Sequence, residues 1–122
     1  MDTTRGILLF GHGARNPEWA APFYRIRDAI IERQPTICVE MGFLELMRPT
    51  LDESIDTLVS RGVTQMIIVP IFMAAGVHIR KDLPLLAAAA MERHQHLSIS
   101  LADPVGEVPA VIDAMASYAL SQ

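Results

Sequence analysis

The sequence predicts an α/β fold, a four-stranded parallel sheet with helices on both faces and the element order βαβαβαβα. Three observations predict it. Four short β-type runs recur at a spacing of about 30 residues, the length of a strand with its crossover helix. Helical patterns fill the intervals between these runs. One run, Met66-Ile67-Ile68-Val69-Pro70-Ile71-Phe72, is apolar on both faces, as a strand covered by helices on each side should be.

The expected strands are residues 6–11, 36–43, 66–72 and 97–102. Each is short, rich in β-branched or large apolar residues, and bounded by glycine, proline or polar residues. The only cysteine, Cys38, falls inside the second strand, where a small buried apolar side chain is its expected role.

The expected helices fill the gaps. Asn16 and Pro17 open the first, which reaches Arg33. The second follows a capping box, Thr50 with Glu53, and ends at Gly62; its apolar stripe is Leu51, Ile55, Leu58 and Val59. The third is expected from about Asp82 to Met91. The fourth carries an apolar face of Val108, Val111, Ile112, Met115 and Tyr118.

The commonest strand order for so small a doubly wound, flavodoxin-like sheet is 2-1-3-4. In this order the first and third strands are neighbours, and the chain reverses its winding direction between them. Ligands of open α/β sheets bind at that switch point, beyond the carboxyl ends of the strands. The segments that follow the first three strands are therefore where functional residues are expected.

Composition limits the possible functions. The 122 residues suffice for one domain, residues 1–122, and a hydrophobic fraction of 51% excludes disorder and indicates a buried interface. The net charge of −4 argues against nucleic acid or an anionic membrane as a partner. A single cysteine, with no signal peptide and no apolar run long enough to span a bilayer, predicts a cytoplasmic protein.

Two histidines and a carboxylate follow the first three strands. His12 lies between Gly11 and Gly13, Glu45 follows the second strand, and His78 follows the third. Two imidazoles and a nearby carboxylate, with coordination positions left open, form a labile site for a divalent metal. The other histidines, His94 and His96, close the third helix, where a solvated helix end is expected.

Four cations, Arg15, Arg48, Arg80 and Lys81, lie just beyond the same three strands. Because the protein as a whole is acidic, their clustering indicates an anionic ligand that carries carboxylates or phosphates. A nucleotide is not expected, because Asn16 stands where the G-x-G-x-x-G pattern requires glycine and no Walker motif is present.

Three segments together resemble a known family. They are Gly-His-Gly-Ala-Arg-Asn-Pro-Glu at residues 11–18, Gly-Phe-Leu-Glu at 42–45, and Val-Pro-Ile-Phe-Met-Ala-Ala-Gly-Val-His-Ile-Arg-Lys-Asp-Leu-Pro at 69–84. They resemble the sirohydrochlorin chelatases, class II ATP-independent chelatases, in their small single-lobe form. The resemblance runs from about residue 6 to residue 104. The sequence departs from the family pattern at two places. Ala14 stands where the family usually has serine, and Met73-Ala74-Ala75 replaces a bulkier apolar run.

The resemblance implies an enzyme that inserts a divalent metal into the tetrapyrrole sirohydrochlorin, for cobalamin or sirohaem biosynthesis. It implies metal ligation by His12 and His78, and a proton-accepting role for Glu45. Cobalt is expected first, then iron or nickel, with no nucleotide required. The ring of carboxylates on sirohydrochlorin would meet the four cations. A homodimer is expected, because two-lobed relatives hold the macrocycle between lobes and this chain supplies one.

Two other functions stay open from the residues alone. The chain could be a metal-binding carrier or regulatory domain that holds the ion without inserting it. It could also be a flavodoxin-like phosphate- or nucleotide-binding domain in which the histidines are incidental. Glu45 and the four cations favour the chelatase over the carrier. The absence of a phosphate-binding sequence pattern disfavours the phosphate- or nucleotide-binding domain.

Overall fold

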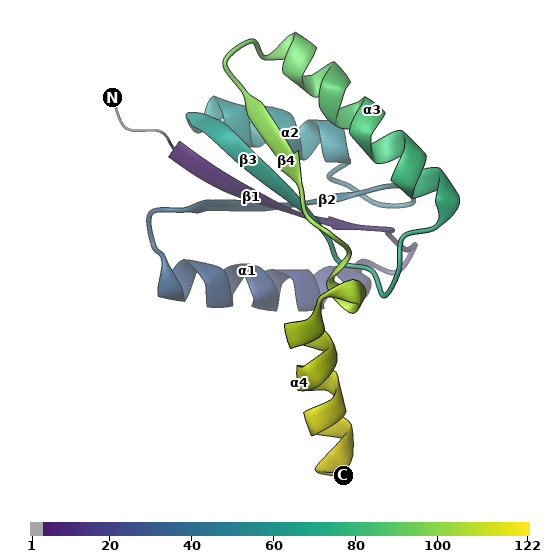
Figure 1. Ribbon diagram of the computed structural model, residues 1–122. Coiled ribbons are helices and arrows are strands. Elements are labelled where there is room, and N and C mark those ends of the chain that lie inside the picture. The colour runs from purple at the N-terminus through teal and green to yellow at the C-terminus, as the bar shows by residue number, and fades with distance from the viewer. Residues whose placement is uncertain (1–3) are drawn as a thin grey trace.

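A computed structural model describes residues 4–122, which form a four-stranded parallel sheet in the order β2-β1-β3-β4. The order expected from the sequence is confirmed. The strands are β1 (Thr4–Gly11), β2 (Cys38–Phe43), β3 (Val63–Pro70) and β4 (Ser98–Leu101). The short edge strand β4 pairs only with the middle of β3, from Gln65 to Ile68. The carboxyl ends of β1, β2 and β3 therefore lie at one edge (Figure 1).

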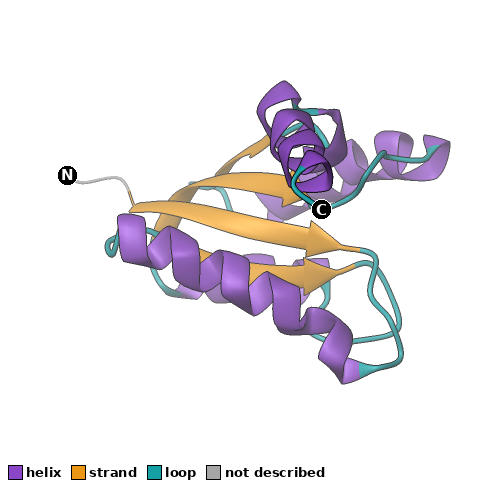
Figure 2. Ribbon diagram, turned by 90° about the horizontal axis from the view of Figure 1, so that it is seen from below, coloured by secondary structure: helices purple, strands orange, loops and turns teal. Residues whose placement is uncertain are grey.

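Helices cover the two faces unequally. A short 3-10 turn, η1 (Pro17–Ala20), leads into α1 (Ala21–Arg33), which lies on one face. The other face is covered by α2 (Leu51–Ser60) and α3 (Val77–Arg93) (Figures 1 and 2). The chain ends with a turn, η2 (Val105–Glu107), and α4 (Pro109–Leu120). None of the helices in residues 4–122 is long and apolar enough to cross a bilayer.

Successive side chains of each strand point to opposite faces of the sheet, so the core has two parts, one on each face. Leu8 and Phe10 of β1 pack with Ile55 and Leu58 of α2, whereas Leu9 packs on the opposite face among the side chains that α1 covers. A strand turns successive side chains to opposite faces, so a strand buried on both sides must be apolar throughout. Burial of each such side chain contributes about 1.5–3 kcal/mol.

The sequence signals for α2 are confirmed. Thr50 and Glu53 form the expected capping box: the backbone N–H of Glu53 donates to Thr50 Oγ1 at 3.2 Å, and the backbone N–H of Thr50 donates to Glu53 Oε1 at 2.9 Å. Gly62 follows the helix with φ of +92°, the left-handed conformation that ends many helices. These caps fix where the chain leaves β2 and enters β3.

The expected start of the third helix is wrong. The structure begins α3 at Val77, with Gly76 as an extended N-cap whose carbonyl accepts from the backbone N–H of Arg80 at 3.1 Å. Pro84 lies inside the helix, a position where proline normally ends or kinks a helix. Because a proline such as Pro84 usually marks a position near the start of a helix, the sequence pattern did not reveal that α3 begins before Asp82. His78 is consequently in the first turn of a helix and not in a loop.

The expected solvated helix end at His94 is also wrong. His94 Nε2 lies 2.8 Å from Asp56 Oδ1, and the Arg93 guanidinium lies 3.1 Å from the same oxygen. These contacts join the end of α3 to α2 at the edge of the sheet opposite His12. The hydrogen bond from His94, followed by the one from Arg93, lowers the pKa of Asp56.

Asp56→Asn should therefore destabilise the protein in a pH-dependent way. A carboxyl with a lowered folded-state pKa contributes stability above its unfolded value, about 3.9, and loses that contribution as the pH falls through the folded value. The difference in unfolding free energy between wild type and Asp56→Asn should be larger at about pH 5 than at about pH 3, both below the ordinary histidine range. Urea unfolding measures it, and an equal difference at both pH values would contradict the assignment.

Candidate metal-binding site

The loops after β1 and β2 are joined by their backbones. The Leu44 N–H donates to the Gly11 carbonyl at 2.9 Å, and the Glu45 N–H donates to the His12 carbonyl at 3.1 Å. These two bonds continue the parallel pairing of β1 with β2 past the ends of both strands. His12 and Glu45 are thereby held side by side at the carboxyl edge of the sheet.

Only glycine fits between these two loops at position 13. Gly13 has φ of +94°, and a Cβ placed there would lie 1.9 Å from the Glu45 carbonyl oxygen. Both the left-handed conformation and the close approach exclude a side chain. The next residue, Ala14, donates its backbone N–H to the Met47 sulfur at 3.3 Å. The glycine after His12 therefore packs the first loop against the second.

The imidazole of His12 rests on an aromatic ring. The ring centroids of His12 and Phe72 are 4.3 Å apart, with the planes tilted by 32°. Phe72 is buried and contacts Phe10 in turn, with centroids 5.6 Å apart. Among residues 4–122 the His12 ring makes no hydrogen bond to protein. A ring held by its face keeps its edge, and hence its nitrogens, open to a metal ion.

Glu45 begins an irregular, exposed segment. The next residue, Leu46, has φ of +68°, which is uncommon for a residue with a branched side chain. The side chains of Leu44 and Leu46 are 41% and 56% exposed. Such backbone strain together with exposed apolar side chains is typical of a ligand site rather than of a simple connection.

His78 approaches the same edge from the third strand. After β3 the chain continues through Ile71, whose N–H donates to the Phe10 carbonyl at 2.8 Å, and through Phe72 beneath His12. The loop then leads to the exposed first turn of α3, which carries His78. Met73 and Val77, 69% and 77% exposed, flank this segment with apolar side chains.

The three expected site residues thus share one edge but do not form a closed ligand set. Within residues 4–122, no three His, Cys, Asp or Glu side chains converge closely enough to enclose an ion. The structure joins His12 to Glu45 by a backbone hydrogen bond and brings the β3–α3 loop to His12 through Phe72. It records no side-chain contact between His78 and either of them.

The four expected cations differ in what they contact. Arg48 forms an ion pair with Glu53 through two of its nitrogens, and this contact raises the pKa of Arg48. The hydrogen bond from Arg48, followed by the one from the Thr50 backbone, lowers the pKa of Glu53 to about 2. Arg80 pairs with Glu107 at 3.1 Å. Within the described chain, Arg15 and Lys81 form no ion pair. Arg15 and Lys81 are therefore available to bind an anionic ligand without breaking an ion pair of the described chain.

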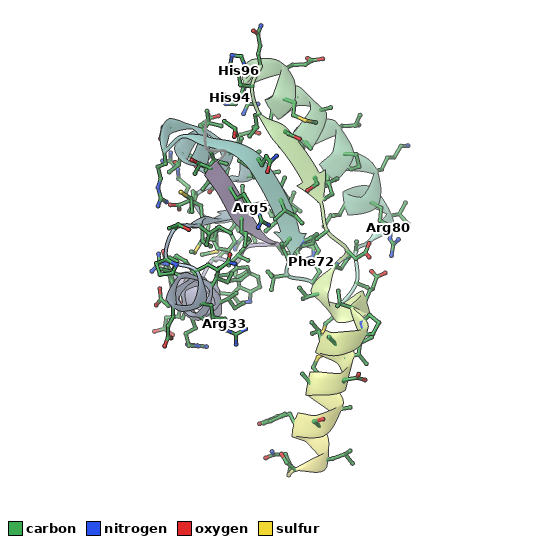
Figure 3. All side chains as sticks on the ribbon, turned by 60° about the vertical axis from the view of Figure 1, so that its left-hand side comes forward. Arg5, Arg33, Phe72, Arg80, His94 and His96 are labelled. Carbon is green, nitrogen blue, oxygen red and sulfur yellow. The ribbon has the colours of Figure 1, made fainter. Side chains whose placement is uncertain are left out.

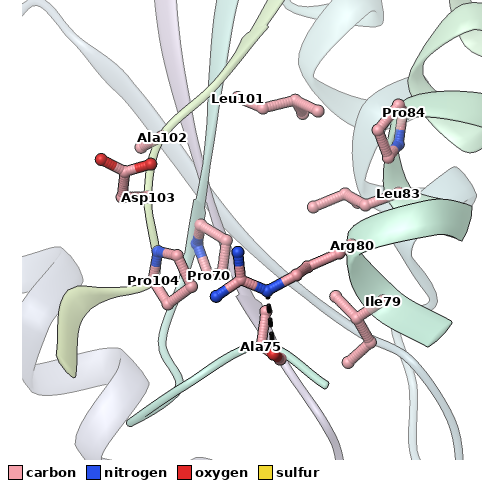
Figure 4. A pocket seen from close by; sticks show the side chains of 10 residues that line it. All are labelled: Pro70, Ala75, Ile79, Arg80, Leu83, Pro84, Leu101, Ala102, Asp103 and Pro104. Carbon is pink, nitrogen blue, oxygen red and sulfur yellow. Dashed lines mark hydrogen bonds between the residues drawn. The ribbon is translucent and has the colours of Figure 1, made fainter. Parts of the chain in front are cut away.

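A cleft of about 290 Å³ opens beside the first turns of α3 (Figure 4). Its apolar walls come from Pro70, Leu83 and Leu101. Arg80 crosses its mouth and donates from Nε to the Ala75 carbonyl at 3.2 Å, drawn as the dashed line in Figure 4. The cleft thus lies next to the candidate site, between α3 and the ends of β3 and β4.

Sequence reasoning missed three residues that shape the site: Phe72, Met47 and Gly106. The sequence predicts Phe72 as the last residue of the third strand, whereas β3 ends at Pro70 and Phe72 lies in the following loop against His12. Gly106 donates its N–H to the Phe72 carbonyl at 2.9 Å, and a Cβ on it would lie 2.1 Å from the Met73 carbonyl oxygen. An isolated glycine sometimes marks such a close backbone approach, but a single sequence does not say to which partner.

The strand order and the joined loops define an open α/β domain whose candidate site lies at the strand switch point. The chain belongs to the CbiX family, whose model matches residues 6–121. It is 42% identical over 84 residues to the sirohydrochlorin cobaltochelatase of Methanosarcina acetivorans, a match that spans 69% of this chain and 65% of that protein. It is 34% identical over 107 residues to the sirohydrochlorin cobaltochelatase of Saccharolobus solfataricus, covering 83% of this chain and 82% of that one.

Solved structures of chelatase-family proteins have the same fold as this chain. A putative cobalamin biosynthesis CbiX protein from Marinobacter aquaeolei superposes with a TM-score of 0.81 at 29% identity, covering 96% of this chain and 95% of that one. The sirohydrochlorin chelatase SirB from Bacillus subtilis, solved with cobalt, superposes with a TM-score of 0.80 at 25% identity. The match covers 98% of this chain but 51% of SirB, so this chain corresponds to half of that protein.

Proposed function

We propose that this protein inserts a divalent metal into sirohydrochlorin, with Co²⁺ as the first candidate and Fe²⁺ or Ni²⁺ as alternatives. Membership of the CbiX family and the cobaltochelatase relatives support this reaction. The observation that carries it for this chain is the joined pair of loops, which holds His12 on Phe72 beside Glu45 at the carboxyl edge. The reaction needs no nucleotide.

In this proposal His12 and His78 bind the metal as it arrives. Insertion exchanges two pyrrolic protons of the macrocycle for one M²⁺, so two protons must leave as the metal–nitrogen bonds form. Imidazoles that leave coordination positions open can hand the ion on, whereas a closed ligand set would retain it. Glu45, next to His12, accepts one of the two protons from the macrocycle, and a neutral imidazole or water accepts the other.

The macrocycle would lie over the apolar side chains at this edge, which are exposed: Leu44, Leu46, Met73 and Val77. Arg15 and Lys81 would bind its peripheral carboxylates first. Arg48 and Arg80 could do so only after exchanging Glu53 or Glu107 for a substrate carboxylate. We therefore rank Arg15 and Lys81 above the other two as substrate-binding residues.

We further propose that residues 1–122 act as a single chelatase domain, as a homodimer in the cytoplasm. A single copy offers one surface to a macrocycle that has two faces. SirB, of which this chain covers 51%, has the length for two such lobes. Two copies of this chain would supply the same pair of surfaces. The chain has a single cysteine, Cys38, and so cannot form an internal disulfide, which is compatible with a reducing compartment.

The proposed reaction is tested by mixing the protein with sirohydrochlorin and Co²⁺ without oxygen and following the absorption spectrum. Insertion should shift the absorption bands much faster with protein than with Co²⁺ alone. The same measurement with Fe²⁺ and Ni²⁺ ranks the metals. Tight Co²⁺ binding without any acceleration would instead show a metal carrier and overturn the proposal.

Glu45→Gln should lower the turnover rate by about 100-fold, the usual contribution of one general base, while the affinity for Co²⁺ changes little. The amide keeps the size of the side chain, and its backbone bond to His12 is unaffected. Turnover is measured by the absorption assay and affinity by calorimetry. A variant with wild-type turnover would show that another group, a histidine or water, accepts the protons.

A further inference from the structure

The η2 turn holds the loop between β3 and α3 at both of its ends. At the β3 end, the Gly106 N–H donates to the Phe72 carbonyl at 2.9 Å. At the α3 end, Glu107 forms an ion pair with Arg80, whose Nη2 lies 3.2 and 3.1 Å from the two carboxylate oxygens. Figure 3 labels Phe72 and Arg80, which both lie close to the junction of β4 with α4. One short turn therefore contacts the loop where it begins and where it ends.

The contact at the β3 end determines where Phe72 lies. A Cβ on Gly106 would be 2.1 Å from the Met73 carbonyl oxygen and 2.4 Å from the Met73 Cα, so the two backbones are already as close as they can be. The Phe72 ring is buried, and the His12 imidazole rests on it at 4.3 Å between centroids. Because close-packed side chains do not shift independently, moving Phe72 would also move the imidazole of His12.

The contact at the α3 end lies in the helical turn that carries His78. The Arg80 guanidinium donates from Nε to the Ala75 carbonyl at 3.2 Å (Figure 4), and the Arg80 backbone N–H donates to the Gly76 carbonyl at 3.1 Å. Glu107 thus holds, through one guanidinium, the end of the loop and the first turn of α3. His78 is two residues before Arg80 in this turn, so its position depends on the same contact.

The η2 turn is itself fixed to the sheet. The Ala102 N–H donates to the Ile68 carbonyl at 2.9 Å, which continues the pairing of β4 with β3 past the end of β4. Pro104 is buried, and its carbonyl accepts from the Glu107 N–H at 2.9 Å. A binding site must be held within about 0.5 Å of its productive geometry by residues that are themselves packed. The η2 turn meets this requirement for both ends of the loop.

We propose that η2 sets the positions of His12 and His78 relative to each other, with Gly106 and Glu107 as positioning residues for the metal. Arg80 then links Glu107 to α3 and does not bind the macrocycle. The proposal rests on the proposed function in one respect, that these two imidazoles bind the ion. It goes beyond that function by assigning a role to a turn outside the three loops of the site.

A matched pair of glycine variants tests the contact at the β3 end. Gly106→Ala forces η2 and Met73 apart, whereas a Cβ at Gly76, in the same loop, would meet nothing within 4 Å. Calorimetry should show a Co²⁺ affinity at least about tenfold lower in Gly106→Ala, as expected of an overpacked contact, and an unchanged affinity in Gly76→Ala. The visible absorption of bound Co²⁺, which reports its coordination geometry, should change in Gly106→Ala alone. A folded Gly106→Ala with wild-type affinity and spectrum would overturn the proposal.

Glu107→Ala and Arg80→Ala test the contact at the α3 end. Both side chains are partly exposed and an exposed ion pair adds little stability, so both variants should fold. Each should weaken Co²⁺ binding about threefold, and the double variant should lose no more than either single one. If Arg80 instead binds the macrocycle, Arg80→Ala raises the KM for sirohydrochlorin, whereas Glu107→Ala lowers it by freeing Arg80. Such opposite shifts, or an unchanged Co²⁺ affinity in both variants, would overturn the proposal.

Glu40→Ala is the control for the loss of an exposed ion pair. It breaks the contact of Glu40 with Arg61, also 3.1 Å long, which joins β2 to the end of α2. Its Co²⁺ affinity should equal that of wild type, and a loss as large as in Glu107→Ala would refute the specific role of Glu107. Failure of the proposed function would look different. A wild type that binds Co²⁺ without inserting it refutes insertion alone, and the comparison of affinities still decides the role of η2.

Discussion

Replacing either His12 or His78 by alanine should reduce metal insertion to the rate seen without protein. In the proposed function each imidazole supplies one bond to the incoming ion, and alanine has no group that can replace it. The fold should survive. His12 is exposed and contacts Phe72 through its ring face only, and His78 is exposed in the first turn of α3, where alanine is a good helix former.

His96→Ala and His94→Ala are the matched controls, because they remove imidazoles at the opposite edge of the sheet. Both should insert metal at near the wild-type rate, although His94→Ala should also be less stable because it loses the contact with Asp56. Circular dichroism and the absorption assay on all four variants provide the comparison. An inactive His94→Ala together with an active His12→Ala would place the metal at the amino edge of the sheet and contradict the proposed site.

Gly13→Ala should have the second large effect, on both the site and the stability. A methyl group at this position would lie 1.9 Å from the Glu45 carbonyl oxygen, so the second loop must move away from the first. That movement breaks the backbone bond that holds His12 beside Glu45. Insertion should fall at least as far as in Glu45→Gln, and the free energy of unfolding should fall as well.

Gly62→Ala provides the control for the backbone conformation alone. Gly62 has nearly the same φ, +92° against +94°, but a Cβ there would meet nothing within 4 Å. The left-handed conformation by itself costs a residue with a side chain about 1–2 kcal/mol. Gly13→Ala should cost about 1–3 kcal/mol more than this, the usual penalty of an overpacked contact. Equal losses in urea unfolding, with insertion intact in Gly13→Ala, would show that the close approach has no role in the site.

The spacing of apolar residues and the signals that begin and end helices were enough to predict the sheet. The spacing of the strands, the capping box at Thr50 and the apolar run of β3 each report local structure that the fold did not override. The carboxyl edge followed from topology alone, since parallel strands must end on the same side. His12, Glu45 and His78 could therefore be assigned to one edge before any contact was known.

The features that the sequence did not reveal depend on contacts between distant segments. The early start of α3 lies upstream of an interior proline, and the pairing of His94 with Asp56 joins two helices. The same holds for Phe72 beneath His12 and for Gly106 against Met73. The apolar face of α4 was predicted correctly, but no signal in the sequence indicated that none of its residues would be buried.

The central claim is that a divalent metal binds at the carboxyl edge between His12 and His78. The anomalous scattering of cobalt in crystals soaked with Co²⁺ tests this claim most directly, because it locates the ion without reference to activity. The account predicts a peak within bonding distance, about 2.0–2.2 Å, of an imidazole nitrogen of each of these two residues. A peak at Asp56 and His94, with none at His12, would contradict it.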